Sequence, residues 1–271
     1  MGRFDGKSII VTGSSSGIGQ AALIAFAKEG ASVVVHGTNS ERIEKTRQLL
    51  KEASISEDRI LVVQGEIQKE ETLQNLVSKT LEKFGKIDVL VNNAGISNAS
   101  GCDPTSIENF DQVMAVNLRA PFRLIELSLP HLKKTKGNII NVSSVAAHMT
   151  PMNSPVMTVY CASKAALDRM TQVQALQFAP FGIRVNNINP GPFTTNISAR
   201  NNLQMDPAHR EIGEKIVTKI TPLGRSADPK ELNEIFLLLA DSDKGSFITG
   251  ACWVIDGGMS VYATNPADLK F

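Results

Sequence analysis

The feature that most constrains the fold is the alternation of short β-branched runs with longer segments of helical period. Seven runs are apolar on mostly consecutive positions, as strands covered by helices on both faces should be. They are Ser8–Thr12, Ser32–His36, Ile60–Gln64, Val89–Val91, Asn138–Val142, Arg184–Ile188 and Ala251–Ile255. The helical patterns between them are Gly17–Glu29, Ser40–Ala53, Lys69–Phe84, Ile107–Lys134, Thr158–Phe178 and Pro229–Leu239. This order predicts an α/β fold, a doubly wound, seven-stranded parallel sheet with helices on both faces.

The length of 271 residues fits one large α/β unit, and no repeat or long Pro/Gly-rich linker divides the chain. We therefore expect a single domain over residues 1–271. Two loops, at about 148–157 and 190–221, are longer than ordinary connections and follow the carboxyl ends of expected strands. That edge of an open α/β sheet holds ligands, so both loops are predicted to shape a substrate pocket.

Composition excludes several classes of function. A hydrophobic fraction of 42%, a charged fraction of 20% and a net charge of +1 lack the imbalance of a nucleic-acid binder. No apolar run approaches the ~18 residues of a membrane-spanning helix, and the N-terminus lacks a signal-type run. Cys102, Cys161 and Cys252 are widely spaced, which favours reduced thiols and offers no metal-ligand pair. We expect a cytoplasmic protein.

A glycine-rich turn follows the first expected strand. Gly13, Gly17 and Gly19 have the spacing Gly-x3-Gly-x-Gly, and a helix begins within the motif. A strand, a glycine turn and a helix N-terminus together present backbone N–H groups and a positive dipole end to a phosphate. Glycine clusters also occur in plain loops, but the flanking strand and helix favour a nucleotide site.

Tyr160 and Lys164 are four residues apart in an expected helix, so their side chains share one face. A free phenol has a pKa near ~10, and a neighbouring ammonium lowers it toward the range useful for general acid–base catalysis. The alternative is an aromatic residue on an ordinary amphipathic helix above a solvated lysine. The remaining motifs favour the acid–base pair.

With these motifs the chain closely resembles the short-chain dehydrogenase/reductases, from about Gly6 to Gly258. The residues that carry the resemblance, in order, are the glycine turn, Asn92-Asn93-Ala94-Gly95, Asn117, Ser143-Ser144, Tyr160, Lys164 and Pro190-Gly191. The resemblance implies a single Rossmann-type domain that binds NAD or NADP. It also implies hydride transfer between the nicotinamide and an alcohol or carbonyl.

The resemblance also assigns roles to the catalytic residues. Tyr160 would supply or accept the proton, Ser144 would hydrogen-bond the reacting oxygen, and Lys164 would bias the tyrosine and hold the nicotinamide ribose. Asn117 would order a water in the proton relay, with a capping or turn amide as the alternative. Ser144 precedes Tyr160 by more positions than in many members of the family, so the intervening loop should bulge toward the substrate.

The cofactor-binding residues follow from the same comparison of motifs. They are Gly13, Ser14, Ser16, Gly17, Ile18, Gly19, Thr38, Asn39, Glu66, Ile67, Asn93, Ala94, Gly95, Tyr160, Lys164, Pro190, Gly191, Phe193 and Thr195. The segment around Phe193 and Thr195 resembles the one that holds the nicotinamide carboxamide, although a plain proline-glycine turn is the alternative. Glu66 replaces the aspartate usual at the adenine edge.

The cofactor preference depends on charge at the end of the second strand. An acidic residue there bonds the ribose 2′-hydroxyl of NAD and repels the 2′-phosphate of NADP. Gly37 occupies the acidic position, so nothing repels a phosphate. Neutral donors from Ser14, Thr38 and Asn39, with Arg42 in reach, favour NADP.

Apolar residues in the two long loops predict a medium-sized hydrophobic ketone or secondary alcohol as substrate. They are Met149, Met152, Met157, Phe193, Ile197, Leu203 and Met205. Alternatives are a catalytically silent nucleotide-binding scaffold or sensor, an NAD-dependent dehydrogenase, or a dehydratase or epimerase of the same fold. The resemblance further implies a homodimer or homotetramer, formed through the helices that end near Lys134 and Phe178.

Overall fold

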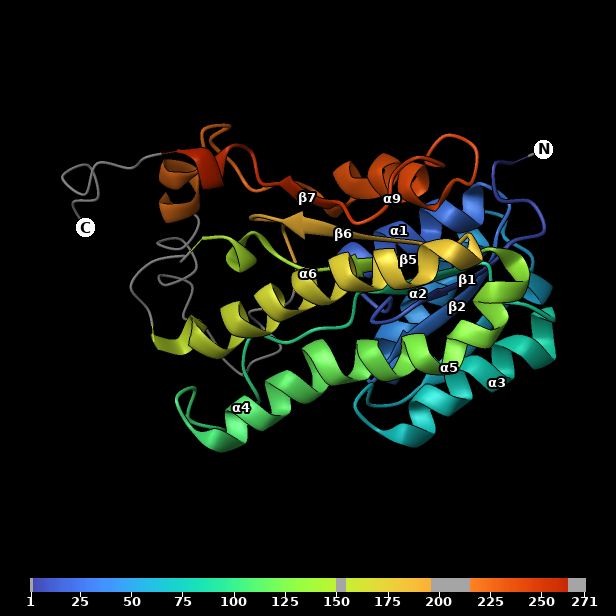
Figure 1. Ribbon diagram of the computed structural model, residues 1–271, viewed down its shortest axis with the longest axis horizontal. Helices are drawn as coiled ribbons and strands as arrows, with labels where there is room; N and C mark the ends of the chain where they lie inside the picture. The colour runs from blue at the N-terminus through green and yellow to red at the C-terminus, as the bar shows by residue number, and fades with distance from the viewer. Residues whose placement is uncertain (1, 150–154, 196–214, 263–271) are drawn as a thin grey trace.

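A computed structural model describes residues 2–149, 155–195 and 215–262 (Figure 1). Seven strands form one parallel sheet in the order β3-β2-β1-β4-β5-β6-β7. The strands are β1 (Ser8–Val11), β2 (Ser32–Gly37), β3 (Ile60–Gln64), β4 (Val89–Asn92), β5 (Asn138–Val142), β6 (Arg184–Pro190) and β7 (Cys252–Ile255). The predicted strands and the parallel sheet are confirmed, with differences only at strand ends.

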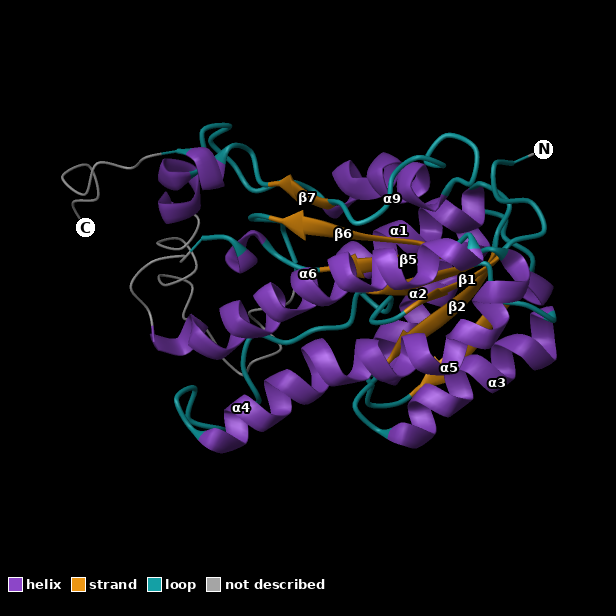
Figure 2. Ribbon diagram, viewed as in Figure 1, coloured by secondary structure: helices purple, strands orange, loops and turns teal. Residues whose placement is uncertain are grey.

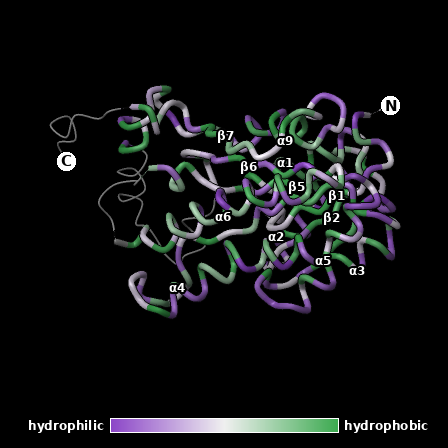
Figure 3. Tube along the Cα trace, in the orientation of Figure 1, coloured by the Kyte–Doolittle hydropathy of each residue, from purple (hydrophilic) through white to green (hydrophobic). Residues whose placement is uncertain are grey.

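Helices cover both faces of the sheet (Figure 2). They are α1 (Gly17–Lys28), α2 (Ser40–Glu52), α3 (Glu70–Phe84), α4 (Ile107–Met114), α5 (Ala120–Thr135), α6 (Thr158–Phe178) and α9 (Asn233–Ala240). One face buries Phe26 of α1, Leu50 of α2 and Phe236 of α9, while the other buries Leu76 of α3 and Leu124 of α5. Hydrophobic colour concentrates along the central strands in Figure 3, as a doubly wound sheet requires.

The expected helix from Ile107 to Lys134 is continuous but not uniform. Its middle, Ala115–Arg119, is a π-helical turn between α4 and α5, in which the N–H of Ala120 donates to the carbonyl of Ala115. The buried amide of Asn117 explains this position, because it bonds both backbone groups of Ile96 outside the helix. The widened turn thus brings an interior side chain to the loop after β4.

The last expected helix also begins differently. Residues Pro229–Leu232 form a 3-10 turn, η6, before α9 starts at Asn233. Asp228 and Glu231 make a capping box at this start. The Asp228 carboxylate accepts from the N–H of Lys230, and the Glu231 carboxylate accepts from the N–H of Asp228. The capping box and the proline explain why the segment starts where it was predicted but opens with a tighter turn.

The strand order reverses between β1 and β4, which are neighbours in the sheet although two strands separate them in the chain. The connections leaving these two strands diverge, and a crevice opens at their carboxyl ends. None of the helices in the described ranges combines the length and hydropathy needed to cross a lipid bilayer.

Candidate active site

The glycine turn lies in the crevice between β1 and β4. Gly13 has a φ of +66°, a backbone conformation that favours glycine. A Cβ on Gly19 would lie 2.3 Å from Nδ2 of Asn93, so no larger residue fits there without movement. The turn therefore packs closely against Asn93 at the N-terminus of α1, an end of a helix that favours an anion.

Asn93 and Thr12 hold the two sides of the crevice together. Nδ2 of Asn93 donates to the carbonyls of Thr12 at 2.9 Å and Gly13 at 3.2 Å. In return, Oγ1 of Thr12 accepts from the N–H groups of Asn93 and Ala94, both at 3.0 Å. These four bonds fix the distance between the ends of β1 and β4.

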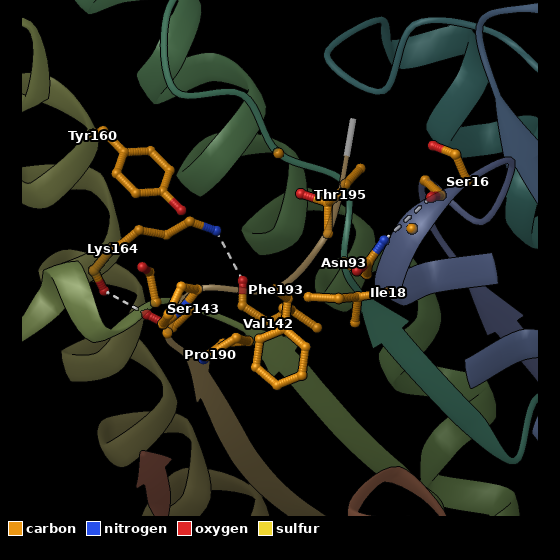
Figure 4. Close-up of a pocket in the computed structure, with 17 residues that line it drawn as sticks. Ser16, Ile18, Asn93, Val142, Ser143, Tyr160, Lys164, Pro190, Phe193 and Thr195 are labelled. Atoms are coloured by element: carbon orange, nitrogen blue, oxygen red, sulfur yellow. Dashed lines mark hydrogen bonds between the residues drawn. The ribbon is translucent and has the colours of Figure 1, made fainter. Parts of the chain in front are cut away.

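Tyr160 and Lys164 lie on the inward face of α6, and both are buried. The Nζ of Lys164 donates to the carbonyl of Val142 at 2.8 Å and lies 5.7 Å from the centroid of the Tyr160 ring. In Figure 4 the phenol oxygen and the ammonium are turned toward one another beside Val142. The shared helical face predicted from their spacing is confirmed.

Burial changes the protonation of this pair. It raises the pKa of Tyr160, a shift that a hydrogen bond with Ser144 opposes in part. Burial also lowers the pKa of Lys164 to about 8, while the charge of Asp168 acts in the opposite direction. The expected net lowering of the Tyr160 pKa is therefore wrong for the cofactor-free protein, because desolvation of the phenolate outweighs its neighbours.

Ser144 and Ser143 follow β5 and have different roles. Ser144 opens the short 3-10 turn η3 (Val145–Ala147), where its Oγ accepts from the N–H of Ala146 at 3.1 Å. Ser143 donates its hydroxyl to the carbonyl of Lys164 at 3.2 Å and so joins the loop to α6. Ser144 is thus placed beside Tyr160, while Ser143 ties the backbone.

The side chain of Asn117 is fully engaged. Its Oδ1 accepts from the N–H of Ile96 at 2.9 Å, and its Nδ2 donates to the Ile96 carbonyl at 2.8 Å and to Oγ of Ser163 at 3.0 Å. Ser163 in turn donates to the carbonyl of Tyr160 at 2.7 Å. Asn117 therefore connects the loop after β4 to the helical turn that carries Tyr160.

A cavity of about 260 Å³ collects most of the predicted site residues. It is lined by Gly13, Ser16, Gly17, Ile18, Asn93, Ala94, Gly95, Val142, Ser143, Ser144, Tyr160, Lys164, Pro190, Gly191, Pro192, Phe193 and Thr195 (Figure 4). We call it the inner cavity. Residues from five different segments of the chain meet here, which supports the grouping inferred from their order in the sequence.

A second cavity of about 700 Å³, the outer cavity, shares Gly13, Ala94 and Gly95 with the inner one. Its other lining residues are Ser15, His36, Gly37, Thr38, Arg42, Glu66, Ile67, Gln68, Ile96, Ala99, Ser100, Cys102, Gln112 and Val116. Two joined cavities around a glycine turn at a helix N-terminus fit an elongated dinucleotide. Of the predicted residues, Thr38, Glu66 and Ile67 lie here.

Three predicted cofactor residues line neither cavity. Oγ of Ser14 accepts from the N–H of His36 at 2.9 Å, and Ser14 is fully buried beneath the turn. Asn39 caps α2 by accepting from the N–H of Arg42 at 2.8 Å. Gly19 packs against Asn93. These residues shape the turn and the helix, and Ser15 lines the outer cavity where we had expected Ser14.

His36 was not among the predicted site residues. Its Nδ1 accepts from the N–H of Gly13 at 3.0 Å, and burial lowers its pKa to about 4, so the ring is neutral at pH 7. It orients the first residue of the glycine turn. Its position as the last residue of an apolar strand beside that turn is the only signal in the sequence that could have indicated it.

The segment after β6 closes the inner cavity. The Thr195 side chain lies beside Gly17, and Phe193 forms a bridge with Ala227 while its ring packs against the core under α1. The ring therefore forms the floor of the cavity as well as part of the core. Of the predicted substrate-loop residues, Met152, Ile197, Leu203 and Met205 lie outside the described residues.

The sequence matches the family described as "Enoyl-(Acyl carrier protein) reductase" over residues 13–260. The chain belongs to the short-chain dehydrogenase/reductase family. It is 36% identical to 3beta-hydroxysteroid dehydrogenase 1 of Eggerthella lenta, over 95% of each chain. It is 33% identical to meso-2,3-butanediol dehydrogenase of Serratia marcescens, over 97% of this chain and 98% of that one.

A solved structure of a short-chain dehydrogenase/reductase of unknown function from Caenorhabditis elegans, with cofactor, is also similar. It matches with a TM-score of 0.90 and 35% identity, covering 96% of this chain and 97% of that one. Together these similarities identify an oxidoreductase, an NAD(P)-dependent short-chain dehydrogenase/reductase. The predicted family and fold are confirmed.

Proposed function

We propose that this short-chain dehydrogenase/reductase transfers a hydride between NADP(H) and a medium-sized hydrophobic ketone or secondary alcohol, with Tyr160 as the general acid and base. The observation that carries the proposal is the position of the Tyr160 hydroxyl. Tyr160 lines the same cavity as the glycine turn, and its buried side chain lies beside Lys164 and Ser144.

The residues of the inner cavity divide the chemistry between them. When bound, the nicotinamide ring supplies or accepts the hydride. The phenol of Tyr160 donates a proton to the developing alkoxide, and its raised pKa keeps it protonated for that step at neutral pH. Ser144 hydrogen-bonds the same oxygen, while Lys164 holds a positive charge beside the phenolate that forms. The ammonium of Lys164 and the segment from Pro190 to Thr195 would hold the nicotinamide half of the cofactor.

The outer cavity supports a preference for NADP over NAD. A Cβ at Gly37 would lie 2.4 Å from Oγ of Ser15, so the end of β2 has no room for the carboxylate that repels a 2′-phosphate. Arg42 lines the same cavity and is half-buried, which places a cation near that end. Glu66 also lines it, but its carboxylate interacts with Gln68 and Lys69.

The substrate class rests on apolar residues in the described parts of the two loops that we expect to shape the substrate pocket. Phe193 and Met157 come from the two loops predicted to shape it, and a relative is named as a hydroxysteroid dehydrogenase. Another relative is named for a small diol. We therefore propose steroid-sized or terpenoid-sized ketones first, with small diketones as the contrasting class in the same assay.

Oxidation of NADPH and NADH with a panel of these carbonyl compounds tests the proposal. Tyr160→Phe should abolish turnover and leave nucleotide binding intact, because the ring shape is retained while the proton is lost. Fluorescence titration of both cofactors provides the binding control. Near-normal kcat in the Tyr160→Phe variant would remove the phenol from the mechanism, and turnover with no carbonyl or alcohol would favour a silent nucleotide-binding scaffold.

A further inference from the structure

A chain of buried hydrogen bonds runs through the centre of the sheet and ends on Asp168 of α6. Asn92 donates to Asn141 at 2.8 Å, and Asn141 donates to Thr171 at 2.7 Å. Thr171 donates to Asn187 at 2.6 Å, and Asn187 donates to Oδ1 of Asp168 at 2.7 Å. Each side chain donates to the next one along the chain of bonds, in the direction of Asp168. Because such bonds polarise one another, the chain stabilises a negative charge at its end.

The other carboxylate oxygen joins Asp168 to the active-site loop. Oδ2 of Asp168 accepts from Nδ2 of Asn189 at 2.7 Å and lies 2.9 Å from Nε2 of His148. The same Nδ2 of Asn189 donates to the carbonyl of Ser144 at 3.2 Å. Asp168 is 5% exposed, two amide groups donate to it, and the ring of His148 lies against it. One buried carboxylate thus ties α6, β6 and the loop that carries Ser144.

Asp168 also follows Lys164 by one helical turn, as Lys164 follows Tyr160. The three side chains therefore lie along one face of α6, and all are buried. The field of Asp168 raises the pKa of Lys164, against the burial that lowers it to about 8. The other titratable groups facing this pair are Tyr160 on α6, His148 after β5 and Cys252 on β7.

We propose that Asp168 is a positioning residue of the active site, which keeps Lys164 protonated and holds the Ser144 backbone in place. The proposal rests on the proposed function, in which the Lys164 charge stabilises the Tyr160 phenolate. Its central element, the electrostatic coupling of Asp168 to Lys164 one turn away on a buried helical face, can be measured without cofactor or substrate.

A double-mutant cycle of urea unfolding measures the coupling between Asp168 and Lys164. The wild type, Asp168→Asn, Lys164→Met and the double variant are unfolded without cofactor at pH 6.5 and 9.5. The pKa of Lys164 in the folded protein is about 8, below its ordinary value of 10.5. Between these two pH values the native state therefore binds fewer protons than the unfolded state. Lys164 is charged in the native protein at pH 6.5 and neutral at pH 9.5.

Asp168→Asn should therefore destabilise the protein more when Lys164 is present than in the Lys164→Met background, and only at the lower pH. Each unit by which the carboxylate raises the Lys164 pKa corresponds to about a tenfold coupling in the unfolding constant. We expect a coupling of about tenfold at pH 6.5 and almost none at pH 9.5. Equal coupling at both pH values, or none at either, would overturn the proposal.

The pH profile of turnover separates this role from a purely structural one. Loss of the carboxylate should lower the Lys164 pKa further, so kcat of Asp168→Asn should fall several-fold more at pH 8 than at pH 6.5. Asp168→Glu restores the charge and should recover most of the loss at pH 8. Asp243→Asn, the same change in an exposed loop at the opposite edge of the sheet, should match the wild type.

A loss in Asp168→Asn that is equal at both pH values would contradict the electrostatic role. If Tyr160→Phe remains active while the urea coupling is present, the proposed function fails and the Asp168–Lys164 pairing stands. If Tyr160→Phe is inactive while the coupling is absent, the proposed function stands and the pairing fails. The two experiments therefore test the two proposals separately.

Discussion

The inner and outer cavities are neighbours, but the chain builds them by different means. The inner cavity depends on buried side chains, Tyr160 and Lys164, whose positions are set by bonds from β5 and by α6. The lining of the outer cavity includes exposed residues at strand ends, such as Thr38 and Glu66. Changes in the first should therefore alter turnover, whereas changes in the second should alter which cofactor binds.

The largest expected effect comes from Lys164→Met in the inner cavity. Removing the ammonium leaves the Tyr160 phenolate without a cation, so we expect kcat to fall by ~10²–10⁴-fold and cofactor affinity to fall as well. Steady-state kinetics and fluorescence titration measure the two effects. In the wild type, kcat for reduction should decline as pH rises through about 8, where Lys164 loses its proton. The variant should lack this decline, and a change in affinity alone would contradict the electrostatic role of Lys164.

The contrast between the cavities also separates what the sequence predicts from what it does not. The strands and the shared face of Tyr160 and Lys164 follow from periodicity, which local geometry dictates. The sign of the Tyr160 pKa shift does not follow, because it depends on desolvation by segments far apart in the chain. A spacing of four residues predicts that Tyr160 and Lys164 are neighbours, but it does not predict how deeply they are buried.

The glycine turn illustrates the same limit at single-residue scale. Its motif predicts a phosphate cradle, but not which adjacent serine points into it: Ser14 bonds the backbone of β2, and Ser15 lines the outer cavity. His36 was missed because its function depends on a contact with Gly13 across two strands. The π turn at Asn117 was missed because an isolated helical pattern carries no signal for an outside partner such as Ile96.

A second prediction tests the junction of the two cavities. Gly19→Ala should weaken NADPH binding by about tenfold or more, although alanine normally favours a helix. The added Cβ would lie 2.3 Å from Nδ2 of Asn93 and 2.8 Å from the Gly13 carbonyl, so the Asn93 side chain or the glycine turn must shift. Ala21→Gly on the same helix is the control and should cost about 1 kcal/mol of stability with unchanged affinity. Normal NADPH binding in Gly19→Ala would contradict this prediction, because it would show that the Asn93 side chain can move without loss of affinity.

A third prediction concerns the outer cavity alone. Gly37→Asp combined with Ser15→Gly, which makes room for the new side chain, should shift the preference from NADP toward NAD by about 10-fold to 100-fold. The carboxylate bonds the 2′-hydroxyl and repels the 2′-phosphate, while the inner cavity is untouched, so kcat should remain close to normal. Ser15→Gly alone is the control. An unchanged ratio of the two dissociation constants would place the ribose elsewhere.

The smallest expected effect is at Asn39, which the motif comparison assigned to the cofactor and the structure assigns to a helix cap. Asn39→Ala should lower the free energy of unfolding by about 1 kcal/mol through the lost bond to the N–H of Arg42. Asn39→Ser keeps a capping oxygen and should recover most of that stability. Neither variant should change kcat or the NADPH dissociation constant, because the Asn39 side chain caps α2. A loss of NADPH affinity in Asn39→Ala that Asn39→Ser did not repair would return Asn39 to the cofactor site and make the outer cavity larger than its described lining.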